Sequence, residues 1–400
     1  MTENSDYLTR QLITYIGNKR ALLPFIFQAL DFIHRELGKE KLDCLDLFSG
    51  SGVVSRFMKA HASSVTANDM ELYAKIISEC YLFSPSENDK NRLLELHDIL
   101  CKKVNAAMRD FESGGNAESA GFISELYAPK DSLRILQNER CFYTSRNAAY
   151  IDFMRREIDK IIPEELKCFF IAPLLSEASI HANTGGVFKG FYKNSETGIG
   201  QFGGKKQDAL SRICGNIELP FPVFSSFQTK SKVFCMDANE LVQSSALYEN
   251  LNGGTFDVVY IDPPYNQHPY GSNYFMLNLI ASYKRPDLNQ ISKISGIPHK
   301  WNHSAYNKKD SSACLFEKLI AEVRTKFVIV SFNSDGFITR SQMEEILSRY
   351  GKLNIFECRY NTFRASRNLH KRSIYVKEYL YVLRKNPAEK YSDVSEEIRL

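Results

Sequence analysis

The residues of this 400-residue chain with the most specific chemistry lie in the run FDVVYIDPPYNQH, at Asp262–Tyr265. An exocyclic amine of adenine or cytosine is a poor nucleophile because its lone pair is delocalised into the ring. Hydrogen-bond acceptors for the amino hydrogens help the nitrogen approach tetrahedral geometry as it attacks a methyl sulfonium. The Asp262 carboxylate and the Pro263 carbonyl supply two acceptors, and Pro263 with Pro264 holds the turn rigid. The Tyr265 ring offers a face for a base taken out of its stack. The motif predicts methyl transfer to a nucleobase amine; the alternative is an ordinary strand-ending turn with an exposed aspartate.

A glycine-containing loop earlier in the chain predicts a nucleoside site. In DLFSGSGVVS, Gly50 and Gly52 stand between an expected strand and an expected helix, and Asp69 follows 19 residues after Gly50. Glycines of this kind let the backbone approach a ligand, and the acid binds ribose hydroxyls. A serine occupies the place of a third glycine, and the acidic Asp46 disfavours a pyrophosphate. This combination favours a nucleoside without phosphates, such as S-adenosylmethionine, whose cationic centre Asp46 could complement. A flexible turn with a surface aspartate is the alternative.

Both motifs fall within an alternation of strands and helices that predicts an α/β, Rossmann-like fold with a doubly wound sheet. Strands are expected at residues 42–48, 63–69, 231–237, 256–262, 326–334 and 377–385, and helices at 19–37, 53–60, 71–82, 91–108, 150–162 and 342–351. Between residues 84 and 229 the alternation gives way to helical stretches and a Gly- and Phe-rich segment. We therefore predict a discontinuous catalytic domain at 11–83 and 230–385, a largely helical insertion at 84–229 and a polar tail at 386–400.

The composition excludes several classes of protein. Hydrophobic residues make up 44% and charged residues 24% of the chain, and the net charge is only +4, unlike that of a histone-like protein. No apolar run reaches the roughly eighteen residues of a membrane span, and the start MTENSDYLTR is too polar for a signal peptide. The nine cysteines include no C-x-x-C pair, so a metal site has no support. We expect a cytoplasmic protein without a membrane partner or a metal ion.

Together these segments make the chain resemble the Dam-like D12 class of adenine-N6-specific DNA methyltransferases, which includes enzymes of restriction–modification systems. DPPY matches the catalytic motif, LDLFSGSG the cofactor loop and TYIGNKRALLPFI the N-terminal cofactor segment, with a tyrosine in place of the family's tryptophan. The order of these segments is that of the Dam group, and the resemblance covers most of residues 11–385 outside the insertion. It implies that S-adenosylmethionine is bound by Tyr15, Lys19, Asp46, Phe48, Ser49, Gly50, Gly52, Asp69, Asp237 and Asp262.

The resemblance also implies a reaction. A methyl group would pass from S-adenosylmethionine to N6 of an adenine flipped out of double-stranded DNA, without a covalent enzyme intermediate. The insertion would be the target-recognition domain, and a cognate restriction endonuclease would be a partner. N4-cytosine methylation is an alternative because it needs the same acceptors. A catalytically idle DNA-binding module on the same fold is another.

Two basic segments are candidates for contact with DNA. Residues 186–232 contain seven Lys or Arg against three acids, interleaved with aromatic residues, and residues 359–372 contain five Lys or Arg and no acid. Basic side chains would hold phosphates while a few polar ones reach base edges. The alternative for the first segment is a solvated face whose aromatic residues turn into a core. The predicted DNA-binding residues are Lys189, Lys193, Lys205, Lys206, Arg212, Arg364 and Arg367.

Overall fold

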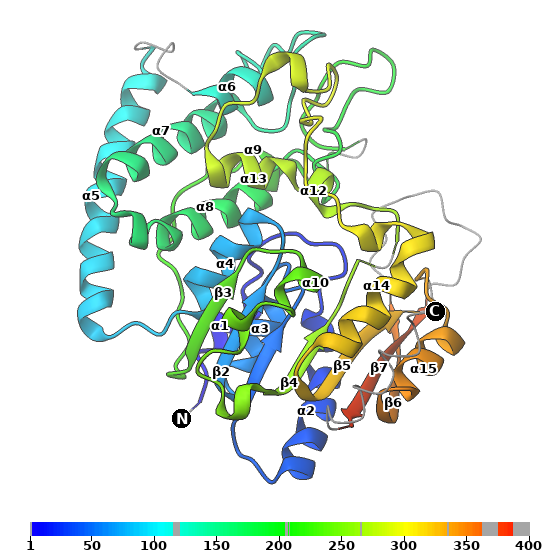
Figure 1. Ribbon diagram of the computed structural model, residues 1–400. Coiled ribbons are helices and arrows are strands. Elements are labelled where there is room, and N and C mark those ends of the chain that lie inside the picture. Colours follow the sequence, from blue (N-terminus) through cyan, green and yellow to red (C-terminus); the bar gives the residue numbers. More distant parts are fainter. Residues whose placement is uncertain are drawn as a thin grey trace.

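The computed structural model shows a mixed α/β protein built on one seven-stranded sheet (Figure 1). It describes residues 2–114, 121–204, 207, 209–264, 266–333, 336–361 and 375–386. The strand order is β3-β2-β1-β4-β5-β7-β6, and neighbours pair in parallel except that β7 runs antiparallel to both β5 and β6. The Rossmann-like α/β prediction is confirmed. The strands are β1 (Leu42–Asp46), β2 (Ala62–Asn68), β3 (Lys230–Phe234), β4 (Phe256–Ile261), β5 (Thr325–Asn333), β6 (Gly351–Asn361) and β7 (Tyr375–Lys385).

Helices cover both faces of the sheet because its central strands are apolar on both sides. All six residues of β4, the run FDVVYI, are buried, as expected for a strand packed on two faces. One face packs against α2 (Leu23–Leu37) and α3 (Val53–Met58). The other face packs against α10 (Ala238–Leu241), α11 (Ser245–Tyr248), α14 (Lys309–Glu322) and α15 (Arg340–Ser348). The sheet is thus held on both sides, so that its strand ends can position a site.

A second group of helices forms a lobe beside the sheet, in the upper part of Figure 1. Most of these helices share one hydrophobic core, which also takes in residues near the N-terminus. Helix α13 is apolar on nearly all sides, which explains why it lies against both α4 and α8. The lobe comprises α5 (Glu87–Glu112), α6 (Phe122–Tyr127), α7 (Ser145–Ile161), α8 (Cys168–Ile180), α9 (Leu210–Cys214), α12 (Tyr270–Asn273) and α13 (Phe275–Ser282). Helix α4 (Leu72–Leu82) packs between this lobe and strands β2 and β3, and α1 (Ser5–Thr9) lies against α3.

The lobe contains more than the predicted insertion. The described residues of 84–229 are largely helical and contribute no strand to the sheet. However, the chain that follows DPPY also returns to the lobe. Tyr127 Oη donates to the Gly296 carbonyl at 2.8 Å, and both Arg285 Nη atoms lie 2.6 Å from the Glu125 carboxylate oxygens. Segments on both sides of the catalytic motif therefore build the helical lobe together.

The chain changes its direction of travel across the sheet between β1 and β4. From β1 it moves outward to β2 and β3, and from β4 it moves to the other side, to β5. Leu47 N–H donates to the Tyr260 carbonyl at 3.1 Å, which holds the ends of β1 and β4 together. In open parallel sheets, ligands bind beyond the carboxyl ends of the strands at such a switch point. The glycine loop follows β1 and DPPY follows β4, so the fold brings the two predicted motifs to this position.

Candidate functional site

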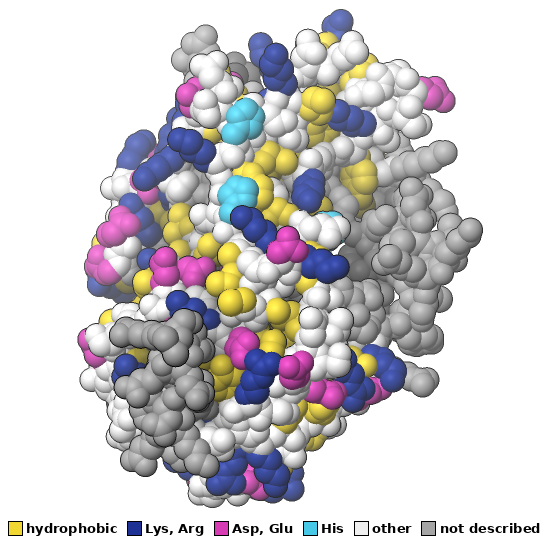
Figure 2. All heavy atoms as spheres, turned by 45° about the vertical axis from the view of Figure 1, so that its right-hand side comes forward, with side chains coloured by type: hydrophobic (Ala, Val, Ile, Leu, Met, Phe, Trp, Pro, Cys, Tyr) yellow, Lys and Arg dark blue, Asp and Glu magenta, His cyan; other side chains and the backbone are white. Residues whose placement is uncertain are grey.

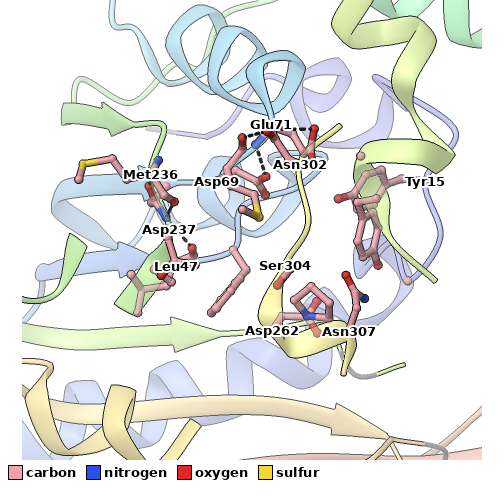
Figure 3. A pocket seen from close by; sticks show the side chains of 18 of the residues that line it. Tyr15, Leu47, Asp69, Glu71, Met236, Asp237, Asp262, Asn302, Ser304 and Asn307 are labelled. Atoms are coloured by element: carbon pink, nitrogen blue, oxygen red, sulfur yellow. Dashed lines mark hydrogen bonds between the residues drawn. The ribbon is translucent and has the colours of Figure 1, made fainter. Parts of the chain in front are cut away.

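A cavity lies at the carboxyl ends of β1, β2, β3 and β4. Its empty volume, part of which is open to solvent, is about 660 Å³. Figure 3 shows how side chains surround it: Met236 and Asp237 on one side, Asp69 and Glu71 above, Tyr15 opposite. Of the predicted site residues, it is lined by Tyr15, Phe48, Asp69, Asp237, Asp262 and Pro264.

A smaller cavity adjoins the first and shares part of its lining. Tyr15, Phe48 and Asp262 border both cavities. Gly52 lines neither, but turns the chain into α3 with a φ of 73°. All the predicted cofactor-binding residues except Gly52 therefore line one of the two cavities; those specific to the smaller one are Lys19, Asp46, Ser49 and Gly50.

The glycine loop and Asp69 are tied together by backbone hydrogen bonds. Gly50 N–H donates to Asp69 Oδ2 at 2.8 Å, and Glu71 N–H donates to Asp69 Oδ1 at 2.9 Å. Burial raises the pKa of Asp69 to about 6, although these hydrogen bonds favour its charged form. A carboxylate has about four acceptor positions, so lone pairs are left for hydroxyl groups of a ligand.

Asp46, the last residue of β1, carries an acceptor atom that the protein does not satisfy. Ser55 Oγ donates to Asp46 Oδ2 at 2.5 Å, whereas Asp46 Oδ1 is buried and has no hydrogen-bond partner. Burial raises the pKa of Asp46 to about 7, and the nearby charges of Asp262 and Asp69 act in the same direction. An unpaired buried acceptor is costly unless something supplies a donor. This corner of the smaller cavity therefore suits a cationic or N–H group of a ligand.

Asp262 forms an ion pair with Lys19 between the two cavities. Lys19 Nζ lies 3.1 Å from Asp262 Oδ1, and the two side chains are 4% and 18% exposed. Burial raises the pKa of Asp262, and the positive charge of Lys19 opposes that rise. The ion pair thus favours the ionised form, which can accept hydrogen bonds. Pro263 is buried, whereas Tyr265 lies outside the described residues.

Two tyrosines that follow DPPY hold Tyr15 in place. The Tyr15 ring stacks on Tyr270 at 5.0 Å between centroids and on Tyr274 at 4.9 Å. The adjacent backbone is fixed as well, because Ile16 N–H donates to Tyr274 Oη at 2.8 Å and Tyr270 Oη donates to the Ile16 carbonyl at 3.2 Å. On its other side, Tyr15 lies against Gly50, where an added Cβ would be 2.8 Å from Tyr15 Cε1. The segment that follows DPPY, the N-terminal segment and the glycine loop are therefore packed as one unit.

Asp237 is placed by the end of β3. Its Oδ1 accepts hydrogen bonds from the backbone N–H groups of Asn239 at 2.9 Å and Glu240 at 3.3 Å, so it caps helix α10. The preceding residue is joined to β2, because Asn68 Oδ1 accepts from Met236 N–H at 3.1 Å. These hydrogen bonds leave Asp237 Oδ2 as the acceptor for a ligand in the larger cavity.

Glu71 and Asn302 lie at the cavity, although no motif indicated them. Asn278 Nδ2 donates to Glu71 Oε2 at 2.5 Å, and Asn302 Nδ2 donates to the Met70 carbonyl at 2.8 Å and lies 3.4 Å from Glu71 Oε2. Burial raises the pKa of Glu71 to about 7. The nearness of Glu71 to Asp69 in the sequence was the available signal, but only the fold joins it to asparagines much later in the chain.

The predicted DNA-binding residues divide into three groups. Lys189 and Lys193 are exposed in the chain between α8 and α9. Arg212 instead donates to the carbonyls of residues 180, 182 and 184, so it holds the end of α8 and we leave it out of the proposed DNA contacts. On the face turned forward in Figure 2, Lys and Arg side chains are scattered over the upper half among hydrophobic ones. Outside the described residues lie Lys205, Lys206, Arg364 and Arg367.

Several known proteins are similar to this chain over most of its length. Residues 15–334 match the family described as D12 class N6 adenine-specific DNA methyltransferase. The chain is 28% identical over 380 residues to the Type II methyltransferase M.NlaIII of Neisseria lactamica, covering 93% of this chain and 99% of that protein. It is 26% identical over 361 residues to the Type II methyltransferase M.CviAII of Paramecium bursaria Chlorella virus 1, covering 88% and 93%. Modification methylase StsI of Streptococcus sanguinis is 26% identical over 388 residues, which cover 94% of this chain and 52% of that protein.

Proposed function

This chain belongs to the D12 class N6 adenine-specific DNA methyltransferases, and we propose that it acts as the modification enzyme of a restriction–modification system. Its proposed substrate is a specific sequence in double-stranded DNA, from which the target adenine is flipped out. The observation that supports this most is that Asp262 borders the same cavity as Asp69 and Asp237, so acceptors for an amine and for a nucleoside share one space. The match of nearly the whole chain to two Type II methyltransferases supports the restriction–modification role.

The family implies S-adenosylmethionine as methyl donor, and the residues of this chain fit it. Asp69 offers acceptors for ribose hydroxyls, and Asp237 offers one for the adenine amine. The buried, unpaired Oδ1 of Asp46 borders the smaller cavity, where a cationic group would satisfy it. Lys19 lines the same cavity and can donate hydrogen bonds to polar groups of the cofactor. When bound, the cofactor supplies an electrophilic methyl group on a sulfonium.

Asp262 and Pro263 prepare the adenine amine for reaction. The carboxylate accepts one amino hydrogen and the Pro263 carbonyl accepts the other, which draws the nitrogen lone pair out of conjugation with the ring. The two prolines keep these acceptors at fixed positions, so little reorganisation is needed at the moment of attack. The methylated nitrogen carries a positive charge until a proton leaves, and in this proposal the Asp262 carboxylate accepts that proton. No covalent bond to the protein is required.

A methyl-transfer assay with labelled S-adenosylmethionine and unmodified bacterial DNA tests the proposal. We expect the label in N6-methyladenine after digestion to nucleosides, and we expect sequencing to map it to one short motif. Label in N4-methylcytosine would support the cytosine alternative instead. DNA binding without any incorporation would support the idle DNA-binding module.

The proposal includes a cognate restriction endonuclease. DNA modified by this enzyme should resist an endonuclease that cleaves at the mapped motif, whereas unmodified DNA should be cut. We also propose that the enzyme acts in the cytoplasm, with the DNA that it modifies. Separately, none of the described helices is both long and apolar enough to cross a membrane.

The affinity for S-adenosylmethionine is expected to fall as the pH decreases. Burial raises the pKa of Asp46 to about 7 and that of Asp69 to about 6, so both carboxyls take up protons in the ligand-free protein below these values. Because the cationic group and the hydroxyls of the ligand require the ionised forms, binding below these pKa values must release protons. Calorimetric titration should show at least ~10-fold weaker binding at about pH 5 than at about pH 8. A constant affinity across this pH range would show that neither carboxylate contacts the cofactor.

Lys189 and Lys193 are expected to contribute to DNA affinity through phosphate contacts. Replacing both with glutamine should reduce the slope of log affinity against log salt concentration by roughly 0.9 per lysine. The methylated motif should stay the same, since phosphate contacts carry no base information. The matched control replaces Lys102 and Lys103, two exposed lysines of α5 in the same lobe. An equal change of slope in both double variants would place the DNA-binding face elsewhere.

A further inference from the structure

Glu378 is a buried acid that the proposed mechanism does not use. It lies in β7 with only 6% of its surface exposed, and its Oε2 atom is buried without a hydrogen-bond partner. Burying a carboxylate without partners is costly, so buried acids are normally hydrogen bonded or paired with a charge. The position of Glu378 indicates which positively charged group it acts on.

Strand register places Glu378 at the same edge of the sheet as the catalytic motif. It pairs with Asn333, the last residue of β5, and so lies at the carboxyl end of that strand. Side chains alternate between the two faces of a sheet, and Tyr260 and Leu380 both belong to the core on the α2 face. Asp262 lies two residues after Tyr260, and Glu378 lies two residues before Leu380. Both side chains are therefore on the face of the sheet that α2 covers. Tyr260 and Asp262 both line the smaller cavity, in agreement with this geometry.

Lys19 reaches this corner from the helix that covers the same face. It precedes the turn Arg20–Leu22, which leads directly into α2, and its Nζ lies 3.1 Å from Asp262 Oδ1. Burial raises the pKa of Glu378, and the charge of Lys19 opposes this rise while that of Asp262 adds to it. Two carboxylates and one ammonium group therefore influence one another in one largely buried corner.

This arrangement matters when Asp262 engages the substrate. In the proposed function, on which this inference rests, the Asp262 carboxylate accepts an amino hydrogen of the target base and so weakens its contact with Lys19. An ammonium group that is 4% exposed needs a negative charge close by. We propose that Glu378 is a positioning residue that supplies this charge and keeps Lys19 in place while Asp262 binds the amine. The Oε2 atom of Glu378, which has no hydrogen-bond partner, is the acceptor that we assign to Lys19.

Steady-state kinetics of three variants test this inference, with unmodified bacterial genomic DNA and S-adenosylmethionine as substrates. Glu378→Gln removes the charge at nearly constant size, and Glu378→Asp keeps it on a shorter side chain. The control, Glu357→Gln, removes a carboxylate from the adjacent strand β6 that is more exposed and lies 2.6 Å from Lys377. We expect Glu378→Gln to lower kcat by at least ~10-fold and to change KM for the cofactor less than ~3-fold. Glu378→Asp should have an intermediate kcat, and the control should match the wild type.

The outcomes separate this inference from the proposed function. A wild-type protein that methylates no DNA overturns the proposed function, and the role of Glu378 with it. An active wild type with unchanged kcat in Glu378→Gln overturns only the role of Glu378. So does an equal loss of kcat in both Glu378 variants, which would indicate packing rather than charge. If Glu378→Gln does not fold, Glu378→Asp decides: a lower kcat at unchanged KM supports the inference, and wild-type kinetics overturn it.

Discussion

Replacing Asp262 with alanine is expected to lower methyl transfer by at least ~100-fold, because one of the two acceptors for the amine is lost. DNA binding at moderate salt should largely survive, since phosphate contacts dominate it. The substitution also removes the carboxylate that lies 3.1 Å from the nearly buried Lys19. That loss should reduce folding stability by on the order of 3 kcal/mol. Single-turnover methylation, DNA titration and thermal unfolding measure the three effects separately.

A double variant distinguishes the catalytic loss from the loss of a buried ion pair. In Lys19→Met with Asp262→Ala, both charges are absent, so most of the lost stability should return. Methylation should not return, because the acceptor is still missing. If either variant transferred methyl groups at the wild-type rate, the assignment of Asp262 as the acceptor would be wrong. Recovery of activity together with stability would show that Asp262 acts only through folding.

Local patterns predicted those parts of the site in which adjacent residues determine both structure and chemistry. The run FDVVYI is apolar at nearly every position, which predicts a strand buried on both faces, and β4 occupies those residues. Gly50 and Gly52 were expected to connect a strand to a helix and to let the backbone approach a ligand, and both have positive φ angles. Asp69, an acid expected at the end of the next strand, is hydrogen bonded to Gly50. Gly50 and Asp69 follow the neighbouring parallel strands β1 and β2, so the spacing of a β-α-β unit is sufficient to predict that they lie close together.

Contacts between distant segments were beyond prediction from one sequence. No spacing connects Tyr15 with Tyr274, which stack at 4.9 Å, because their pairing depends on how α13 returns to the helical lobe. A count of basic residues cannot distinguish a guanidinium that binds phosphates from one that donates to backbone carbonyls. Arg212 is of the second kind. Likewise, Glu378 is an ordinary polar residue in a strand pattern, and only the order and register of the strands place it at the same edge of the sheet as the catalytic motif.

Replacing Gly50 with alanine is expected to weaken S-adenosylmethionine binding by at least ~10-fold through a direct clash. Gly50 has a φ of 50°, and a Cβ atom there would lie 2.8 Å from both Cε1 and Oη of Tyr15. That ring cannot move aside easily, because it stacks on Tyr270 and Tyr274. The added methyl group must therefore displace either the glycine loop or the aromatic stack, and both border the predicted cofactor site. Calorimetric titration with S-adenosylmethionine measures the loss of affinity.

Gly38→Ala is the matched control, because it separates backbone strain from the clash. Gly38 ends α2 with a φ of 61°, yet a Cβ atom there would meet nothing within 4 Å. Both substitutions force alanine into the left-handed region, which costs roughly 1–2 kcal/mol of stability. Gly38→Ala should therefore lower the unfolding temperature and leave cofactor affinity unchanged. If the two variants lost stability equally and both bound S-adenosylmethionine like the wild type, contact between Tyr15 and the glycine loop would have no part in shaping the cofactor site.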